Sequence, residues 1–209
     1  MFYLIRTPWW LRKLYPRVTW HLPGVEKVIY ISFDDGPHPE ITPFVLDELK
    51  KYGARASFFC LGKNILHNRE VYKRIIDEGH TIGNHSFSHK NGWKTKDKIW
   101  LDDISEAKKY IDSTLFRPPY GRATRFQLNA LAGPGFQFHT IMWTILSADF
   151  DERVTPEQCY ANVIKKTKSG DIIVFHDSEK AYPRMRYALP LVLKYFSERG
   201  YQFEKITVK

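Results

Sequence analysis

The chain has 209 residues, of which 43% are hydrophobic and 15% aromatic, and its formal net charge is +9. That length and composition fit one globular domain with at most a short extension. No stretch approaches the roughly 20 apolar residues of a membrane span, so no spanning helix is expected. Cys60 and Cys159 are too few and too far apart for a disulfide scaffold or a CxxC metal site, and we interpret them as core thiols.

The positive charge favours an anionic partner, such as nucleic acid, an acidic membrane surface or an acidic wall polymer. No recognisable nucleic-acid module is present, so nucleic acid is not expected as a partner. We expect the protein to be a monomer that makes peripheral contact with an anionic membrane or wall polymer.

Residues 1–25 form the expected N-terminal arm, in which residues 1–23 contain basic and aromatic side chains but no acid. Tryptophan beside arginine suits a lipid headgroup layer. Packing of these aromatic side chains over the domain is the alternative, and Pro8 and Pro16 limit any helix to a short piece. The arm lacks the pattern of a cleavable signal peptide, which leaves the location open between the cytoplasm and the membrane or cell envelope.

The expected catalytic domain covers residues 26–209, where apolar runs alternate with amphipathic segments. Helices are expected at 42–52, 69–78, 97–111, 155–168 and 185–199. Strands are expected at 28–34, 54–61, 81–85, 115–117, 136–144, 171–176 and 201–206. Strands interleaved with helices predict an α/β domain with a mainly parallel sheet.

Polar residues interrupt these strands mostly at their carboxyl ends. They are Asp34 with Asp35, His85, Arg117 with Tyr120, Asp149 and His176. In parallel α/β folds that edge carries the active site, because its loops converge on one face. The sequence therefore predicts a functional site at this edge.

Asp34 and Asp35 end the apolar strand 28–34 as two adjacent carboxylates. In an extended segment their side chains point to opposite sides, so one can face a metal while the other faces solvent or substrate. The alternative is that Asp35-Gly36-Pro37 is simply a turn.

His85 and His89 are four residues apart, and one helical turn would place both on a common face within reach of one ion. With one carboxylate, they would give three ligands and an open position for water, as in catalytic zinc sites. The alternative is a strand-capping histidine and an exposed one. The availability of Asp35 favours the metal site.

Five segments follow one another at the strand ends: SFDDGP at 32–37, HSFSH at 85–89, RPPYG at 117–121, DF at 149–150 and VFHD at 174–177. Together they resemble the ordered motifs of the polysaccharide deacetylases, the NodB homology domain of carbohydrate esterase family 4. The resemblance covers about residues 26–206. It implies a distorted (β/α) barrel with about seven mainly parallel strands.

The resemblance also implies a role for each residue of the first two motifs. Asp35, His85 and His89 match the metal ligands, and Asp34 matches the general base that deprotonates the attacking water. Zinc is the first choice for this ligand set, and nickel, cobalt or manganese fit the same ligands.

The later motifs supply the remaining catalytic groups. Arg117 matches the arginine that orients the base, and the backbone N–H of Tyr120, held by Pro118 and Pro119, matches a donor to the oxyanion. His176 matches the general acid that protonates the leaving amine. Asp149 accompanies it and is expected to raise the pKa of its imidazole by charge attraction. A core or capping role is the alternative for His176.

The sequence departs from the family mainly where substrate binds. Pro118, Phe150 and Val174 are the expected substrate contacts. Phe150 stands where the family usually has tryptophan. Val174 stands where leucine is more frequent and helps to form the pocket for the acetyl methyl group. Leu146 stands where an acidic residue is frequent. No catalytic group is removed by these changes.

The expected function is metal-dependent removal of acetyl groups from N-acetylglucosamine units of a glycan such as peptidoglycan or a chitin-like oligosaccharide. One alternative is a hydrolase of the same fold that acts on a small amide or cyclic imide, for which a closed pocket would be expected. The other alternative is a glycan-binding pseudoenzyme.

Overall fold

A parallel β-sheet forms the centre of the computed structural model, which describes residues 3–24 and 26–208. The strand order is β5-β4-β3-β2-β1-β7-β6, with β8 paired to β1, and every pair is parallel. The strands are β1 Val28–Asp34, β2 Ala56–Cys60, β3 Thr81–Asn84, β4 Leu115–Phe116, β5 His139–Thr140, β6 Ile145–Leu146, β7 Ile172–His176 and β8 Gln202–Phe203. The mainly parallel α/β fold predicted from the sequence is confirmed.

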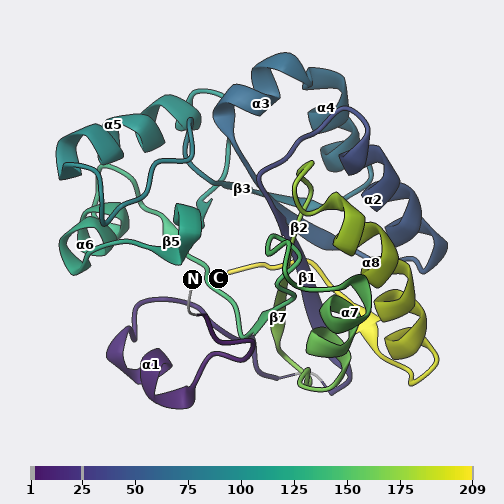
Figure 1. The fold of residues 1–209 in the computed structure, drawn as a ribbon. Helices are drawn as coiled ribbons and strands as arrows, with labels where there is room; N and C mark the ends of the chain where they lie inside the picture. The colour runs from purple at the N-terminus through teal and green to yellow at the C-terminus, as the bar shows by residue number, and fades with distance from the viewer. Residues whose placement is uncertain (1–2, 25, 209) are drawn as a thin grey trace.

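The helices surround this sheet (Figure 1). They are α1 Trp9–Leu14, α2 Ile41–Lys51, α3 Gly62–His67, α4 Arg69–Asp77, α5 Asp97–Lys108, α6 Arg125–Ala132, α7 Pro156–Ile164 and α8 Tyr182–Ser197, with a 3₁₀ turn at Pro119–Gly121. Apolar faces of α2, α7 and α8 pack on β1, β2 and β7 in the main core, which also contains Cys60 and Cys159 as free thiols. Both cysteines are therefore core residues, as expected.

The two outer strands of the sheet are close in sequence. β5 and β6 stand at opposite ends of the strand order, yet only residues 141–144 separate them. Because so few residues span at most about 17 Å, the two edges must approach each other and the sheet must curl. The predicted distorted barrel is thus present as a curled, incompletely closed sheet.

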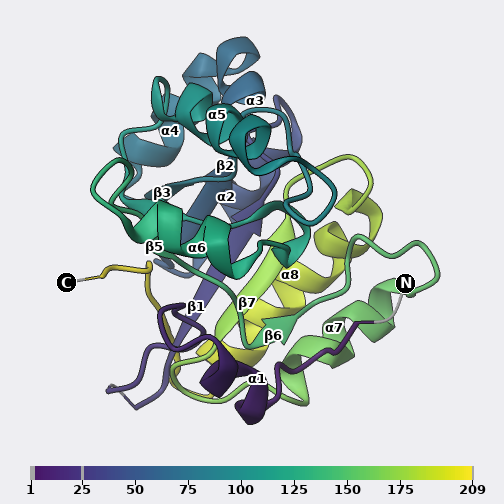
Figure 2. The ribbon, with the colours of Figure 1, turned by 90° about the vertical axis from the view of Figure 1, so that its left-hand side faces the viewer.

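The N-terminal arm lies along the gap between these edges (Figure 2). Thr19 forms a bridge with Ile141, and Arg6 forms one with Ile145. The Arg6 guanidinium also lies 2.5 Å from the buried carboxylate of Asp171. The predicted boundary at residue 25 and the first two residues of the arm lie outside the described residues. Within 3–24 and 26–208, no helix combines the length and the apolar character that a bilayer span requires.

Local sequence signals mark the start of α7 and the ends of α4 and α8, close to where they were predicted. Thr155 and Gln158 form a capping box at the start of α7, with Pro156 at the first helical position. Gly79 and Gly200 follow α4 and α8 with φ of 80° and 73°, a conformation that glycine adopts without strain.

Some predicted elements were wrong. The strand expected at 136–144 is only the two residues of β5, and β6 follows separately. Helices α3 and α6 were not predicted. One continuous strand over 136–144 cannot form, because residues 141–144 connect β5 and β6 at opposite edges of the sheet.

Candidate active site

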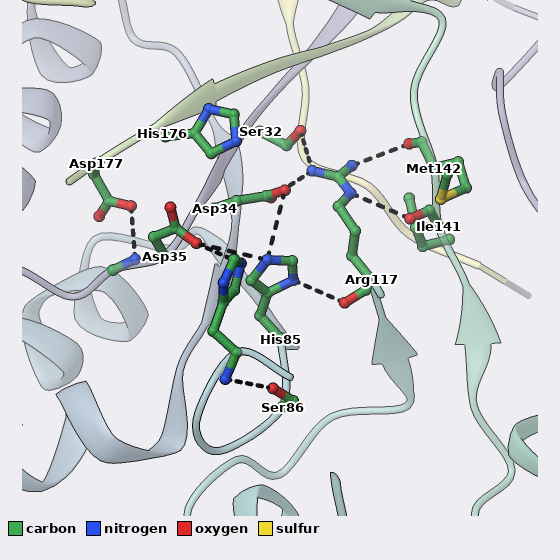
Figure 3. Close-up of polar contacts among 12 residues, drawn as sticks. Ser32, Asp34, Asp35, His85, Ser86, Arg117, Ile141, Met142, His176 and Asp177 are labelled. Carbon is green, nitrogen blue, oxygen red and sulfur yellow. Dashed lines mark hydrogen bonds and ion pairs between the residues drawn. The ribbon is translucent and has the colours of Figure 1, made fainter. Parts of the chain in front are cut away.

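The polar residues at the strand ends meet on one side of the sheet, as Figure 3 shows. Asp34 ends β1 and is paired in register with His176, which ends β7. Arg117 follows β4, and its backbone N–H donates to the carbonyl of Asn84 immediately before His85. Parallel pairing therefore brings side chains from four separate strands to one edge, as predicted.

Asp34 and Asp35 do not point to opposite sides of an extended strand, which corrects the sequence prediction. Asp35 has a φ of 82°, so the chain leaves the extended conformation immediately after β1. Carboxylate oxygens of Asp34 and Asp35 lie 4.0 Å and 3.7 Å from Nε2 of His85. The two carboxylates therefore face the same site.

His85 and His89 are on a loop and not on a helical turn, which corrects a second prediction. Positive φ values of 69° at Ser86 and 63° at His89 coil this loop tightly. The two imidazole rings still approach each other, with centroids 5.2 Å apart. The predicted proximity is correct, but the backbone produces it in another way.

Asp103 of α5 anchors this histidine loop and had no predicted role. Its carboxylate accepts hydrogen bonds from the backbone N–H groups of Phe87 and Ser88 at 3.1 Å and 3.0 Å. It also accepts from the Ser88 hydroxyl at 2.6 Å and lies 2.8 Å from Nζ of Lys90. A single buried carboxylate thus holds the backbone between the two histidines.

We expect Asp103→Ala to weaken metal binding by about 10–100-fold, because the loop that carries His85 and His89 loses its anchor. Isothermal titration of the apoprotein with zinc measures this change. Asp102→Ala is the matched control on the same helix, since Asp102 is exposed and its ion pair among the described residues is with Lys98. Equal zinc affinities of the two variants would contradict the anchoring role.

Asp35, His85 and His89 are a candidate metal site. One ligand atom from each lies within 4.8 Å of the other two, which is compatible with one ion about 2 Å from all three. Oδ1 of Asp35 is buried without a hydrogen-bond partner among the described residues and lies 3.2 Å from Nε2 of His89. An orphaned carboxylate oxygen between two imidazoles fits a divalent cation.

The protonation states of these groups suit metal binding. Nδ1 of His85 donates to the Arg117 carbonyl at 2.7 Å, which leaves Nε2 with a lone pair toward Asp35. Burial lowers the pKa of His85 to about 4, so its imidazole is neutral at pH 7. Burial acts to raise the pKa of Asp35, but the neighbouring histidines hold it below its usual range. The triad is thus consistent with a divalent metal.

Arg117 lies fully buried behind Asp34 and is held from several sides. One terminal nitrogen donates to Oδ1 of Asp34 at 2.7 Å and to the Ser32 hydroxyl at 2.8 Å. Nε and the other terminal nitrogen donate to the carbonyls of Ile141 and Met142 at 3.1 Å and 3.0 Å. This network fixes the orientation of the Asp34 carboxylate.

His176 and Asp149 form a second charged pair. Nδ1 of His176 donates to Oδ1 of Asp149 at 2.7 Å, and the His176 backbone N–H donates to Oδ2 at 2.7 Å. Burial lowers the pKa of this imidazole, but Asp149 outweighs that effect and raises it to about 10. At neutral pH the imidazolium therefore has an Nε2 proton to donate.

The comparisons with known proteins agree with this arrangement. The family model described as polysaccharide deacetylase matches residues 21–139. The chain belongs to the polysaccharide deacetylase family. The resemblance inferred from the five sequence motifs is thereby confirmed.

Two curated polysaccharide deacetylases and one solved structure illustrate the similarity. A peptidoglycan-N-acetylglucosamine deacetylase of Bacillus cereus is 35% identical over 197 residues, covering 91% of this chain and 91% of that protein. The peptidoglycan-N-acetylmuramic acid deacetylase PdaA of Bacillus subtilis is 33% identical, covering 87% and 70%. The crystal structure of the Bc1960 peptidoglycan N-acetylglucosamine deacetylase with 4-naphthalen-1-yl-N-oxidanyl-benzamide has a TM-score of 0.86 at 28% identity, covering 96% and 95%.

A cleft of about 720 Å³ leads to the candidate metal site of this deacetylase. Pro118 and Phe150, two of the three predicted substrate contacts, line it together with Tyr120. Val174 is only 1% exposed and is not among the cleft residues, so its contact with an acetyl methyl stays a prediction. Tyr120 is half-exposed beside His89 and has a φ of 61°, which gives the backbone after Pro118 and Pro119 a sharp bend.

The N-terminal arm forms another wall of the same cleft. Leu11, Tyr15 and Trp20 line the cleft from the arm, and Trp93 and Leu128 line it from the rest of the domain. The loop of residues 90–96 thus borders the cleft through Trp93. The deacetylase cleft is more apolar on the arm side than the motifs alone indicated.

Asp177 is the last residue of the motif at 174–177 and had no predicted role. Its buried carboxylate accepts from the Gly36 N–H at 3.0 Å and from the Thr42 hydroxyl at 2.5 Å. A Cβ on Gly36 would lie 2.1 Å from Oδ2 of Asp177, so only glycine fits there. Asp177 therefore fixes the turn that directs Asp35 into the metal site.

Proposed function

We propose that the protein is a zinc-dependent N-deacetylase of peptidoglycan, acting on N-acetylglucosamine units and releasing acetate. The observation that carries the proposal is one cleft that holds a metal-ligand triad, a carboxylate held by arginine and a protonated histidine. Each of these groups has a defined use in amide hydrolysis. The names of the similar deacetylases support peptidoglycan as the substrate class.

Asp35, His85 and His89 would hold the ion, and zinc is the first choice for one carboxylate and two imidazoles. A divalent ion in this position supplies Lewis acidity that activates water and polarises the amide carbonyl. Asp34 lies beside the triad without being part of it, and Arg117 fixes its carboxylate. Asp34 would therefore accept the proton of the attacking water.

His176 would act at the amide C–N bond that the reaction breaks. Cleavage of the amide C–N bond requires a proton on the leaving nitrogen, because an amine anion is a very poor leaving group. The Nδ1 proton of His176 is engaged by Asp149, so Nε2 is the position from which the imidazolium donates. Water thus adds to the carbonyl carbon, acetate leaves with that carbon, and the sugar retains a free amine.

The backbone at Tyr120 would donate to the oxyanion that develops during attack. Its strained φ of 61° follows two prolines that restrict the chain on one side. Pro118 and Phe150 would contact the sugar beside the acetamido group. Phe150 also lies edge-on to His176, with ring centroids 5.5 Å apart, and so limits how that imidazole can turn.

Acetate release from a panel of substrates tests the proposal. The panel contains peptidoglycan with N-acetylglucosamine and N-acetylmuramic acid, N-acetylchitooligosaccharides, and a small cyclic imide. We expect the highest kcat/KM on the N-acetylglucosamine glycans. Turnover of the cyclic imide alone would favour the small-amide hydrolase, and no turnover by metal-loaded protein would favour the pseudoenzyme.

The pH dependence of this activity should depend on Asp149. Because the pKa of His176 is raised to about 10, the acid form is present at neutral pH and is lost as the pH rises through that value. Asp149→Asn removes the charge that raises it, so the alkaline limb should move down toward the ordinary imidazole value of about 6.5. Profiles of kcat/KM against pH measure this shift, and an unchanged alkaline limb would contradict the assignment of His176.

A further inference from the structure

The solvent-facing side of helix α1 carries large apolar side chains. Trp9, Trp10 and Leu14 are 63%, 50% and 51% exposed. The i, i+4 spacing places Leu14 one turn after Trp10, and it places Lys13 one turn after Trp9. A helix on the surface of a globular protein normally turns such residues inward. The outward face of α1 is therefore a candidate interaction surface.

This face is held in a fixed position by the rest of the arm. Leu11 and Tyr15, on the opposite side of α1, line the active-site cleft. Before the helix, the backbone N–H of Thr7 donates to the Thr144 carbonyl at 2.9 Å, and Arg6 pairs with Asp171. The exposed tryptophans are thus presented by an anchored element.

The charged side chains of the arm itself all have one sign. Residues 3–24 contain basic side chains and no acid. Arg6 forms an ion pair with Asp171, and Arg17 donates to the Asn129 side chain at 3.2 Å. Arg12 and Lys13 are in the last turn of α1, and Nζ of Lys13 lies 5.0 Å from the centroid of the Trp9 ring. Indole rings beside basic groups match the headgroup layer of an anionic bilayer, where the rings insert and the cations meet lipid phosphates.

The surface continues from the arm onto helix α6. The guanidinium of Arg125 lies 5.9 Å from the Tyr15 ring, and its neighbour Phe126 is 62% exposed. Figure 2 shows α6 and α1 on the same side of the molecule. The cleft passes between them, since it is lined by Leu11 and Tyr15 from the arm and by Leu128 from α6.

We propose that the outward face of α1 docks on an anionic phospholipid bilayer and holds the mouth of the cleft at the membrane surface. Docking depends on α1 and not on the proposed activity. If the activity is also as proposed, the accessible substrate is glycan close to the membrane.

Sedimentation with vesicles tests the docking. The full-length protein is mixed with vesicles of phosphatidylcholine alone or of phosphatidylcholine with phosphatidylglycerol. We expect binding to the anionic vesicles, weakened by high salt, and a partition coefficient at least about tenfold lower for the double variant Trp9→Ser and Trp10→Ser. Equal partition of wild type and this variant, or no binding to anionic vesicles at low salt, would overturn the proposal.

Two controls separate docking from other effects. The charge-reversing pair Arg12→Glu and Lys13→Glu should reduce binding, whereas Lys50→Glu and Lys73→Glu, on helices α2 and α4, should leave it within about twofold although the net charge changes equally. Equal losses in both pairs would mean a non-specific charge effect and would overturn the proposal. Trp9 and Trp10 do not line the cleft, so acetate release from a soluble N-acetylchitooligosaccharide by the tryptophan variant reports separately on the proposed function.

Discussion

Asp34→Asn is expected to lower kcat for acetate release by about 10²–10⁴-fold, the usual contribution of a positioned general base. An amide oxygen can still accept the Arg117 hydrogen bond, but an amide cannot take the proton of the attacking water. The variant should therefore lose proton transfer while the side chain keeps its position. Single-turnover acetate release by metal-loaded protein measures it without interference from product release.

Two measurements make this result interpretable. Zinc titration should show affinity close to that of wild type, because Asp34 is outside the Asp35, His85 and His89 triad. Asp102→Asn, the same substitution at an exposed position of α5, should leave turnover unchanged. Wild-type turnover by a folded, metal-loaded Asp34→Asn protein would contradict the assignment of the base.

Arg117→Met is expected to reduce the free energy of unfolding by about 3–5 kcal/mol, the usual cost of removing one partner of a buried ion pair. Arg117 is 0% exposed and Asp34 is 3% exposed, so the variant leaves a carboxylate buried without its cation. The carbonyls of Ile141 and Met142 also lose their donors. Denaturant unfolding followed by circular dichroism gives the change.

A double-mutant cycle isolates the ion pair from the rest of this loss. Adding Asp34→Asn to Arg117→Met removes the uncompensated charge, so the double variant should be more stable than Arg117→Met alone. Arg117→Lys should not restore wild-type stability, because one ammonium group cannot reach the carboxylate, the hydroxyl and both carbonyls. Additive losses in the cycle would show that the two charges do not interact as described.

The positions of the candidate site residues could be predicted because they depend on strands. Apolar runs ended at Asp34, His85, Arg117 and His176, and the carboxyl ends of parallel strands share one edge whatever the details of their loops. A run of apolar residues indicates directly that a strand is buried. The role expected of each group came from the resemblance to the polysaccharide deacetylase motifs.

The conformation of the connecting loops could not be predicted in the same way. The spacing of His85 and His89 is also the spacing of a helical turn, and nothing in the sequence marks Ser86 and His89 as residues with positive φ. Asp35 likewise leaves the strand at a positive φ, which places it on the same side as Asp34. These conformations are imposed by tertiary contacts, among them the bonds from Asp103 to the histidine loop.

No local sequence pattern marks the residues that hold the site in place. Asp103 is one of several acids in a polar helix, and its role appears only when α5 packs against the histidine loop. The arm is similar, because its basic and aromatic composition left open contact with a membrane or packing over the domain. That composition did not indicate that Leu11 and Tyr15 would line the cleft. In both cases the role of the residues depends on contacts between segments that are distant in sequence.

Acetate release from peptidoglycan by metal-stripped and reloaded protein tests the central claim most directly. We expect no release after chelation, recovery on binding of one zinc ion per chain, and no recovery for His89→Ala at the same zinc concentration. Full turnover by the chelated protein would contradict the account, and so would the absence of acetate from every N-acetylglucosamine glycan when the zinc site is filled.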